Sequence, residues 1–252
     1  MAIVAAPEHC QDLKNIFDLD YLRQVPRRGI IHVGADVGQE VPQYLEYGFR
    51  NVMLIEANPE KYDVLRAKFD HHSNVRLFNY AVCDKDGIID FHVHTSRTGS
   101  SEPASILPMK RFKEIVKTLY TAKTIRVPAI TLDTLFDRHR IAAADYNFFN
   151  IDTQGAELLA FAGAAKVISA MDVIISEVNV IELYENGTLE SEIIAFLSRH
   201  GFEKRHAVYH TLYDEISTFP AWGECLFVKR KAAAQDGTQS CSSAAIPKPA
   251  SP

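Results

Sequence analysis

The chain has 252 residues, of which 47% are hydrophobic and 23% are charged, and its formal net charge is −5. This length can bury a full core in one large α/β domain or in two small ones. The composition is that of an ordinary globular protein, which excludes a fibrous or low-complexity chain. Because the charge is negative, nothing attracts a nucleic-acid backbone in general, and we expect a small-molecule ligand and no nucleic acid.

Cysteine spacing and hydropathy indicate a cytoplasmic protein. None of the four cysteines (Cys10, Cys83, Cys225 and Cys241) has a neighbour at metal-binding or redox spacing, which favours reduced thiols. The first residues lack the basic region and the apolar length of a signal peptide. No window approaches the length of a membrane span. The sequence leaves room for a homo-oligomer.

Strands and helices are predicted to alternate after a helical lead-in over residues 1–28, in which apolar residues recur at roughly helical spacing. The expected strands are 30–33, 52–55, 75–78, 88–94, 125–130, 148–151, 173–178, 202–209 and 224–229. The expected helices are 39–47, 59–69, 108–120, one from 131, 158–168 and 188–200. This alternation predicts an α/β fold with a mostly parallel sheet, helices on both faces and ligands at the carboxyl ends of the strands.

Two segments depart from this alternation. Residues 96–130 begin with a small-polar loop, and we interpret them as an insertion over the ligand-bearing edge of the sheet. Residues 232–252 contain almost no large apolar side chain and are predicted to be a disordered tail. The main domain is therefore expected to cover residues 29–231.

The first strand, turn and second strand have the layout of a nucleoside site. The strand ends in a turn from Gly34 to Gly38, and the second strand ends in Glu56, where an acid can hold ribose hydroxyls. A third glycine is missing from this turn, and Asp36 would repel a pyrophosphate. An acid in the turn suits a cationic, phosphate-free nucleoside such as S-adenosylmethionine better than a dinucleotide.

Further polar residues follow the other strands. Asp152 and Glu177 stand at strand ends, so they should reach the same edge as Asp36 and Glu56. Asp152 could equally cap the helix that follows it, and Glu157 could complement that helix dipole. His92 and His94 alternate on a strand that we interpret as wet, so no metal is expected.

The motifs resemble those of a known family. Ile31-His32-Val33-Gly34-Ala35-Asp36-Val37-Gly38 and Ile55-Glu56-Ala57-Asn58-Pro59 are similar to the first two motifs of class I methyltransferases. Later motifs in the right order resemble the FkbM-type family within that class. They are Asn79 to Gly87, Gly99-Ser100-Ser101, Thr131 to Leu135 and Asn150-Ile151-Asp152-Thr153-Gln154-Gly155-Ala156-Glu157-Leu158.

The resemblance implies a Rossmann-like fold with a seven-stranded sheet whose last strand is antiparallel, and methyl transfer from S-adenosylmethionine to a hydroxyl oxygen. The acceptor would be a sugar, a glycolipid or a secondary metabolite, that is, a small molecule or glycan with a free hydroxyl. Many members carry an acid where this chain has His32. The residues expected at the cofactor are His32, Gly34, Asp36, Gly38, Glu56, Ala57, Asn58, Ala81, Val82, Ser101 and Asp152.

Methyl transfer to a hydroxyl also needs a base that takes the hydroxyl proton. Asp152 and a histidine near the end of the sixth strand, His210, are both candidates, and the sequence does not decide between them. Two other functions fit the first unit of the fold. One is an NAD(P)-dependent oxidoreductase, which the missing third glycine disfavours. The other is a non-catalytic protein that binds S-adenosylmethionine without turnover.

Overall fold

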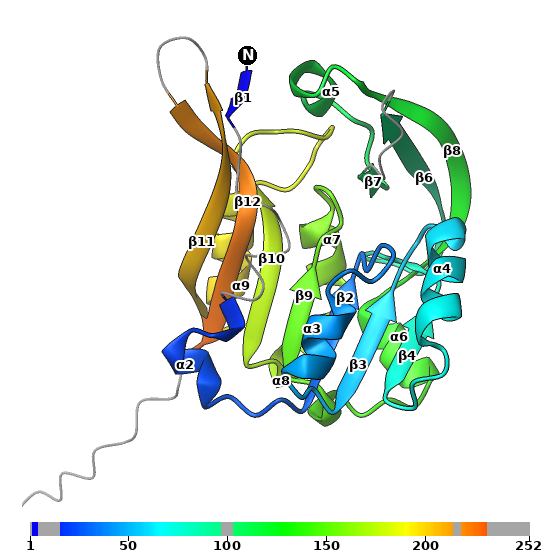
Figure 1. Cartoon of the computed structure of the whole chain (residues 1–252), viewed down its shortest axis with the longest axis vertical. Coiled ribbons are helices and arrows are strands. Elements are labelled where there is room, and N and C mark those ends of the chain that lie inside the picture. The colour runs from blue at the N-terminus through cyan, green and yellow to red at the C-terminus, as the bar shows by residue number, and fades with distance from the viewer. Residues whose placement is uncertain (1, 5–15, 97–102, 214–217, 231–252) are drawn as a thin grey trace, which may run out of the picture.

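The structure is a computed structural model, and it describes residues 2–4, 16–96, 103–213 and 218–230. They form an eight-stranded sheet and a smaller four-stranded sheet (Figure 1). The predicted tail at 232–252 and the candidate residue Ser101 lie outside the described residues.

The large sheet consists of β1 (Ala2–Val4), β2 (Gly29–Val33), β3 (Asn51–Ile55), β4 (Val75–Phe78), β9 (Phe148–Ile151), β10 (Val173–Asn179), β11 (Phe202–Tyr213) and β12 (Thr218–Lys229). Its strand order is β1-β11-β12-β10-β9-β2-β3-β4. The strands from β10 to β4 pair in parallel, whereas β12 runs antiparallel to both of its neighbours. The predicted seven-stranded sheet with an antiparallel last strand is confirmed, and β1 adds an eighth strand at the edge.

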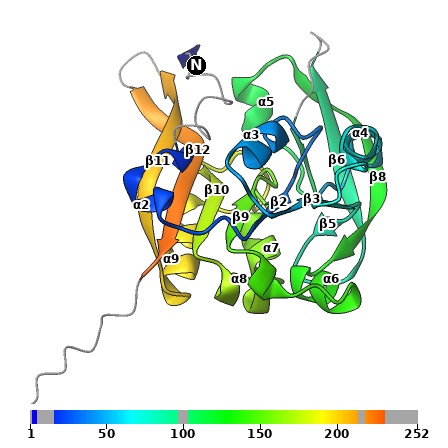
Figure 2. The ribbon, with the colours of Figure 1, turned by 60° about the horizontal axis from the view of Figure 1, so that its bottom comes forward.

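Helices cover both faces of this sheet (Figure 2). One face carries α2 (Asp20–Arg23), α3 (Val41–Glu46) and α4 (Pro59–Phe69), and the other carries α6 (Leu132–Arg138), α7 (Glu157–Ala162), α8 (Ala165–Ala170) and α9 (Glu190–Arg199). A short 3₁₀ turn, Ala143–Asp145, precedes β9. Ile30 packs into the first layer, whereas Ile31 and Val33 pack into the second. The continuous apolar run of β2 follows from this, since both of its faces are buried.

The small sheet corrects one prediction. It contains β5 (Ala81–Val82), β6 (Gly87–Ser96), β7 (Ala104–Ser105) and β8 (Leu119–Ile130). The helix predicted at 108–120 is wrong, because only α5 (Phe112–Ile115) is helical and β8 begins at Leu119. The whole length of β6 pairs with β8, from Ser96↔Leu119 to Gly87↔Ala129. These long-range backbone hydrogen bonds override the local helical pattern.

The helix predicted at 158–168 is broken in two at Gly163, between α7 and α8. A Cβ at Gly163 would lie 2.1 Å from the carbonyl oxygen of Cys83, so the chain comes too close to its neighbour for a side chain. The break could not be predicted from the local sequence, because it depends on the contact between Gly163 and the segment after β5, which is remote in sequence.

In the predicted helical lead-in, the structure describes strand β1, two helical residues at 16–17 and the short helix α2. Ile16, Phe17 and Leu22 are buried against the first helical layer. Among the described residues, no helix is both long enough and apolar enough to span a membrane.

Candidate active site

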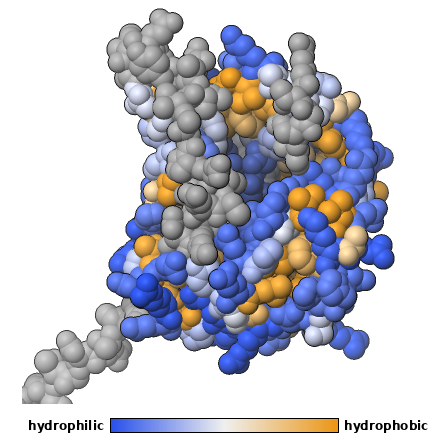
Figure 3. Space-filling model, viewed as in Figure 1, coloured by the Kyte–Doolittle hydropathy of each residue, from blue (hydrophilic) through white to orange (hydrophobic). Residues whose placement is uncertain are grey.

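A pocket of about 320 Å³ lies at the carboxyl ends of β2, β3 and β9, and Figure 3 shows the surface hollowed there, with hydrophilic residues in the hollow. Phe91 of β6, Ala104 of β7 and Ile106 line one side, so the small sheet forms part of the wall. The volume lies in the range of small-molecule sites, which is about 300–1,000 Å³. The predicted site residues that line the pocket are His32, Gly34, Asp36, Glu56, Ala57, Ala81, Val82 and Asp152.

The glycine turn after β2 brings its backbone close to the end of β9. Gly34 has a φ of +80°, and a Cβ there would lie 1.8 Å from the carbonyl oxygen of Asp152. Glycine is therefore required both by conformation and by space. Gly38 has a different task, because a Cβ there would lie 2.5 Å from the Phe69 ring of α4. It permits helix packing and does not line the pocket.

The carboxylate of Glu56 is held in place by the backbone. Its Oε2 accepts from the Asp36 N–H at 2.9 Å, and its Oε1 accepts from the Asn58 N–H at 2.7 Å. Glu56 is 5% exposed, and burial raises its pKa to about 7 against these two bonds and the nearby Lys61. Asn58 does not line the pocket; its side chain caps α4 by accepting from the Glu60 N–H.

Asp36 is already paired. Its carboxylate forms a salt bridge with Lys61 of α4 and accepts from the Gln39 amide at 2.7 Å. Burial opposes its charge, but the bonds from Lys61 and Gln39 outweigh burial, and the pKa of Asp36 is lowered. Asp36 therefore enters the pocket as an anion whose charge Lys61 partly compensates.

His32 is buried and lies in a hydrogen-bonded row with Tyr44 of α3 and Asn150 of β9. The Asn150 amide donates to the Tyr44 hydroxyl at 2.8 Å, and that hydroxyl lies 3.1 Å from Nδ1 of His32. Since Tyr44 accepts from Asn150, we assign its proton to His32 Nδ1, which places the imidazole proton on Nε2. Burial lowers the pKa of His32 against the nearby carboxylates Glu40, Asp152 and Asp36, so the ring is neutral.

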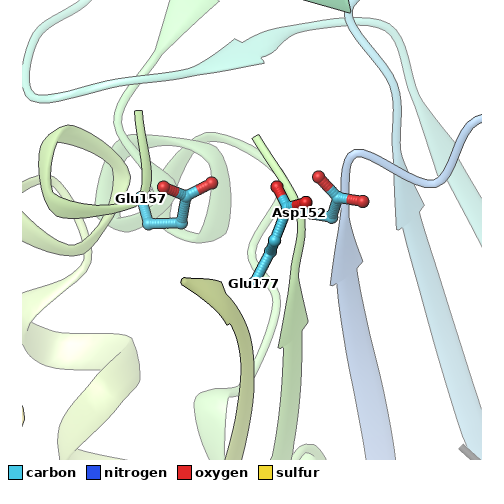
Figure 4. A group of neighbouring side chains, drawn as sticks. All are labelled: Asp152, Glu157 and Glu177. Carbon is cyan, nitrogen blue, oxygen red and sulfur yellow. The ribbon is translucent and has the colours of Figure 1, made fainter. Parts of the chain in front are cut away.

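Three carboxylates gather beside the pocket, from the end of β9 (Asp152), the start of α7 (Glu157) and β10 (Glu177) (Figure 4). One oxygen of each lies within 4.8 Å of the others. The Gln154 amide donates to Asp152 Oδ1 at 2.7 Å and to Glu177 Oε2 at 2.8 Å. Burial raises the pKa of Glu157 to about 7 and that of Glu177 well above its usual range, and the charge of Asp152 adds to both shifts.

A model of the "Methyltransferase FkbM domain" matches residues 32–204, which is more than half of the chain. The chain belongs to the FkbM methyltransferase family. Its cofactor is therefore S-adenosylmethionine, and family membership decides against the NAD(P)-dependent oxidoreductase. The pocket fits this cofactor, because it offers a buried carboxylate at the end of β3 and, in the part of the chain that the structure describes, a single lining lysine, Lys61, for any phosphate.

Solved structures similar to this FkbM-family chain include other methyltransferases. One is magnesium protoporphyrin IX methyltransferase from Synechocystis PCC 6803 with bound SAH, at 10% identity over 88% of this chain and 83% of that chain, with a TM-score of 0.47. Another is the methyltransferase domain of bacterial CtHen1-C, at 9% identity over 87% and 97% of the chains, with a TM-score of 0.44. No curated protein matches the sequence.

Besides Gly38 and Asn58, two further predicted site residues of this FkbM-family protein, His210 and Ser101, are not among the described residues that line the pocket. His210 does not line the pocket; it lies opposite Trp222 in the β11–β12 pair and stacks on that indole with centroids 4.9 Å apart. Ser101 lies outside the described residues, although its neighbour Pro103 does line the pocket.

Sequence reasoning missed several residues that line the pocket of the FkbM-family protein or contact a residue that does. Tyr44 looked like an apolar position on α3, yet its hydroxyl reaches His32 and Asn150. Lys61 had no role in the sequence analysis, yet it pairs with Asp36. Gln154 was present in the family motif without an assigned role, and it now joins two carboxylates. The one available signal in the sequence was that the Gln154 amide stands in a motif that also contains Asp152 and Glu157.

Proposed function

We propose that this methyltransferase transfers the methyl group of S-adenosylmethionine to a hydroxyl oxygen of a small molecule or glycan. The observation that carries the proposal is the charge of the pocket. Its lining carboxylates are Asp36, Glu40, Glu56, Asp152 and Glu224, and among the described residues its one lining lysine or arginine is Lys61. Such a pocket repels phosphates and other anions, which favours a neutral polyol over a nucleic acid.

The nucleoside end of the cofactor is assigned to the β3 side. Glu56 is buried with both oxygens fixed by backbone N–H groups, and each oxygen keeps a lone pair for a ribose hydroxyl. Ala81 and Val82 of β5 line the neighbouring wall and offer a flat apolar surface for adenine. The turn at Gly34 then receives the methionine end.

His32 is assigned to the carboxylate of that methionine end. Its Nδ1 accepts from Tyr44, so Nε2 carries a hydrogen and can only donate. A donor matches the cofactor's carboxylate, whereas the acid found at this place in many relatives suits the ammonium. Asp36 and Asp152 are the lining acids that remain for the ammonium group.

Asp152 is the better supported of the two candidate bases. It lines the pocket and comes directly after β9, whereas His210 does not line the pocket and stacks on Trp222. When bound, the cofactor supplies a methyl carbon activated by its sulfonium. Asp152 orients the acceptor hydroxyl and takes its proton as the new oxygen–carbon bond forms and the sulfur–carbon bond breaks.

The test is methyl transfer from radiolabelled S-adenosylmethionine to a panel of neutral glycans and small alcohols, with an RNA pool as the anionic comparison. We expect label in a hydroxyl-bearing neutral acceptor, as a methyl ether in its mass spectrum. Label in RNA, or on an acceptor nitrogen or carbon, would contradict the proposal. Tight binding of S-adenosylhomocysteine without turnover on any acceptor, cell extract included, would support the non-catalytic alternative.

A further inference from the structure

The carboxylates of Asp152, Glu157 and Glu177 form a cluster that pairs with no cationic side chain among the described residues, although the Gln154 amide donates to Asp152 and Glu177. One oxygen of each lies within 4.8 Å of the others, and Glu157 is fully buried. The salt bridges among the described residues all lie elsewhere. Since like charges this close repel strongly away from water, the cluster requires either shared protons or a cation.

Glu157 favours a cation over a proton. Its Oε1 accepts from the Thr153 N–H at 3.0 Å, the Thr153 hydroxyl at 3.1 Å and the Gly155 N–H at 3.1 Å. Three donors on one oxygen stabilise the ionised carboxylate. Its Oε2 is buried without a hydrogen-bond partner among the described residues. An ionised Oε2 has no donor among the described residues, and a cation would supply the partner that it lacks.

Figure 4 shows one oxygen of the Glu157 carboxylate turned towards the carboxylates of Asp152 and Glu177. The side chain therefore faces the cluster while its backbone begins α7. The three ligands come from β10, from the residue directly after the neighbouring strand β9, and from the first residue of α7.

A second buried side chain on β10 is also unsatisfied. Asn179 is 2% exposed, and neither its Oδ1 nor its Nδ2 has a partner among the described residues. It lies two positions after Glu177, on the same face of the strand. An amide oxygen is a suitable ligand for a hard cation, either directly or through a bound water.

We propose that Asp152, Glu157 and Glu177 bind one hard divalent cation of the Mg²⁺, Mn²⁺ or Ca²⁺ class, a metal that the sequence did not lead us to expect. All three ligands are carboxylate oxygens, which these ions prefer over sulfur and nitrogen ligands. Opposite ligands of an octahedral ion lie about 4.2 Å apart for Mg²⁺ and about 4.8 Å apart for Ca²⁺. The three oxygens lie within 4.8 Å of one another, so no two of them are further apart than opposite ligands of Ca²⁺.

The cation would stand at the acceptor side of the pocket, because Asp152, Thr153 and Gln154 all line it. There it can bind an acceptor hydroxyl and lower the pKa of that hydroxyl, so that less basicity is required of Asp152. This role rests on the proposed O-methylation, whereas binding of the cation does not.

The experiment is titration of the full chain, saturated with S-adenosylhomocysteine, with Mn²⁺ alone, followed by the electron paramagnetic resonance of free Mn²⁺. We expect one site in the wild type. Affinity should fall by about tenfold or more in Glu177→Gln, and the ion should protect the wild type, not this variant, against thermal unfolding. The matched control is Glu190→Gln, since Glu190 is a partly buried carboxylate that pairs with Lys204 away from the pocket.

Absence of a single site in the wild type would overturn the proposal and assign the cluster to shared protons, and so would equal Mn²⁺ affinity in wild type and Glu177→Gln. Because Glu157 also holds the turn, Glu157→Gln is used only if its cooperative unfolding is retained, and it should then also lose the site. No methyl acceptor is present in any of these measurements. The cation site can therefore be disproved while the proposed O-methylation remains correct, and O-methylation can be disproved while the cation site remains correct.

Discussion

The turn at Gly34 lies directly against the backbone of Asp152, where a Cβ on the glycine would come within 1.8 Å of the aspartate carbonyl oxygen. The Asp152 N–H in turn donates to the Val33 carbonyl at 3.0 Å. These contacts join the cofactor turn after β2 to the acid after β9. The turn that we propose for the methionine end of the cofactor and the proposed base are therefore held side by side by backbone atoms.

Gly34→Ala should destabilise the protein severely, by ~3 kcal/mol or more, because the new methyl group overlaps a carbonyl and adds backbone strain. Gly48→Ala is the matched control. Gly48 has a similar φ of +77° but no atom within 4 Å of its Cβ position, so only strain of about 1–2 kcal/mol is expected. Urea unfolding measures both free energies, and equal losses would show that the contact with Asp152 is unimportant.

Replacing Glu56 by Gln should change both the pH dependence of folding stability and the binding of the cofactor, and the two effects can be measured separately. The folded-state pKa of Glu56 is raised from 4.5 to about 7, so the native state holds its proton more tightly than the unfolded state does. This contribution to stability is present below pH 4.5 and is lost as the pH rises towards 7. The free energy of unfolding of the ligand-free protein should therefore fall less steeply between pH 5 and pH 8 in Glu56→Gln than in the wild type.

The same Glu56→Gln variant should bind S-adenosylhomocysteine at least ~10-fold more weakly, because a charged acceptor of ribose hydroxyls is lost. Isothermal titration calorimetry at pH 8, where the wild-type carboxylate is ionised, provides the comparison. An unchanged affinity would remove Glu56 from the cofactor site.

Replacing His32 should weaken the binding of cofactor analogues that carry a carboxylate more than that of analogues that lack one. His32→Leu removes the Nε2 donor and is expected to weaken the binding of S-adenosylhomocysteine by about 10–100-fold. The affinity for decarboxylated S-adenosylmethionine should change little, because that ligand has no carboxylate. His32→Gln, which can present an amide N–H at a similar place, should recover part of the loss. If His32→Leu lowers the affinity for both ligands equally, the His32 ring has a purely structural role.

Asp152 and His210 can be separated by turnover. Asp152→Asn should lower kcat by about 10²-fold or more, the usual contribution of a general base, and this loss should exceed the loss of cofactor affinity, to which Asp152 can contribute beside the ammonium group. His210→Gln should retain most activity because its ring stacks on Trp222 outside the pocket. The reverse pattern would make His210 the base. Both assays are run once the acceptor is known, with Mg²⁺ present.

Much of the fold could be predicted because its signals are local. Runs such as Ile30-Ile31 and Val52 to Ile55 are buried on both faces and so read as strands without knowledge of their partners. The helix at 108–120 could not be corrected in this way, since β8 depends on its pairing with β6. A strand whose residues are mostly exposed has weak local preference, and the partner strand decides its conformation.

The sequence by itself determined the family, the order of the strands in the parallel part of the large sheet along the chain, and the positions of Gly34, Glu56 and Asp152 after strand ends, because apolar runs and residue periodicity are local signals. Only the tertiary structure decided what these residues touch. Tyr44 and Asn150 stand 106 positions apart and still set the tautomer of His32. Glu177 meets Asp152 because β9 and β10 are neighbours in the sheet. Protonation, tautomers and ion binding depend on distances of a few ångströms between remote residues, and a linear pattern does not contain those distances.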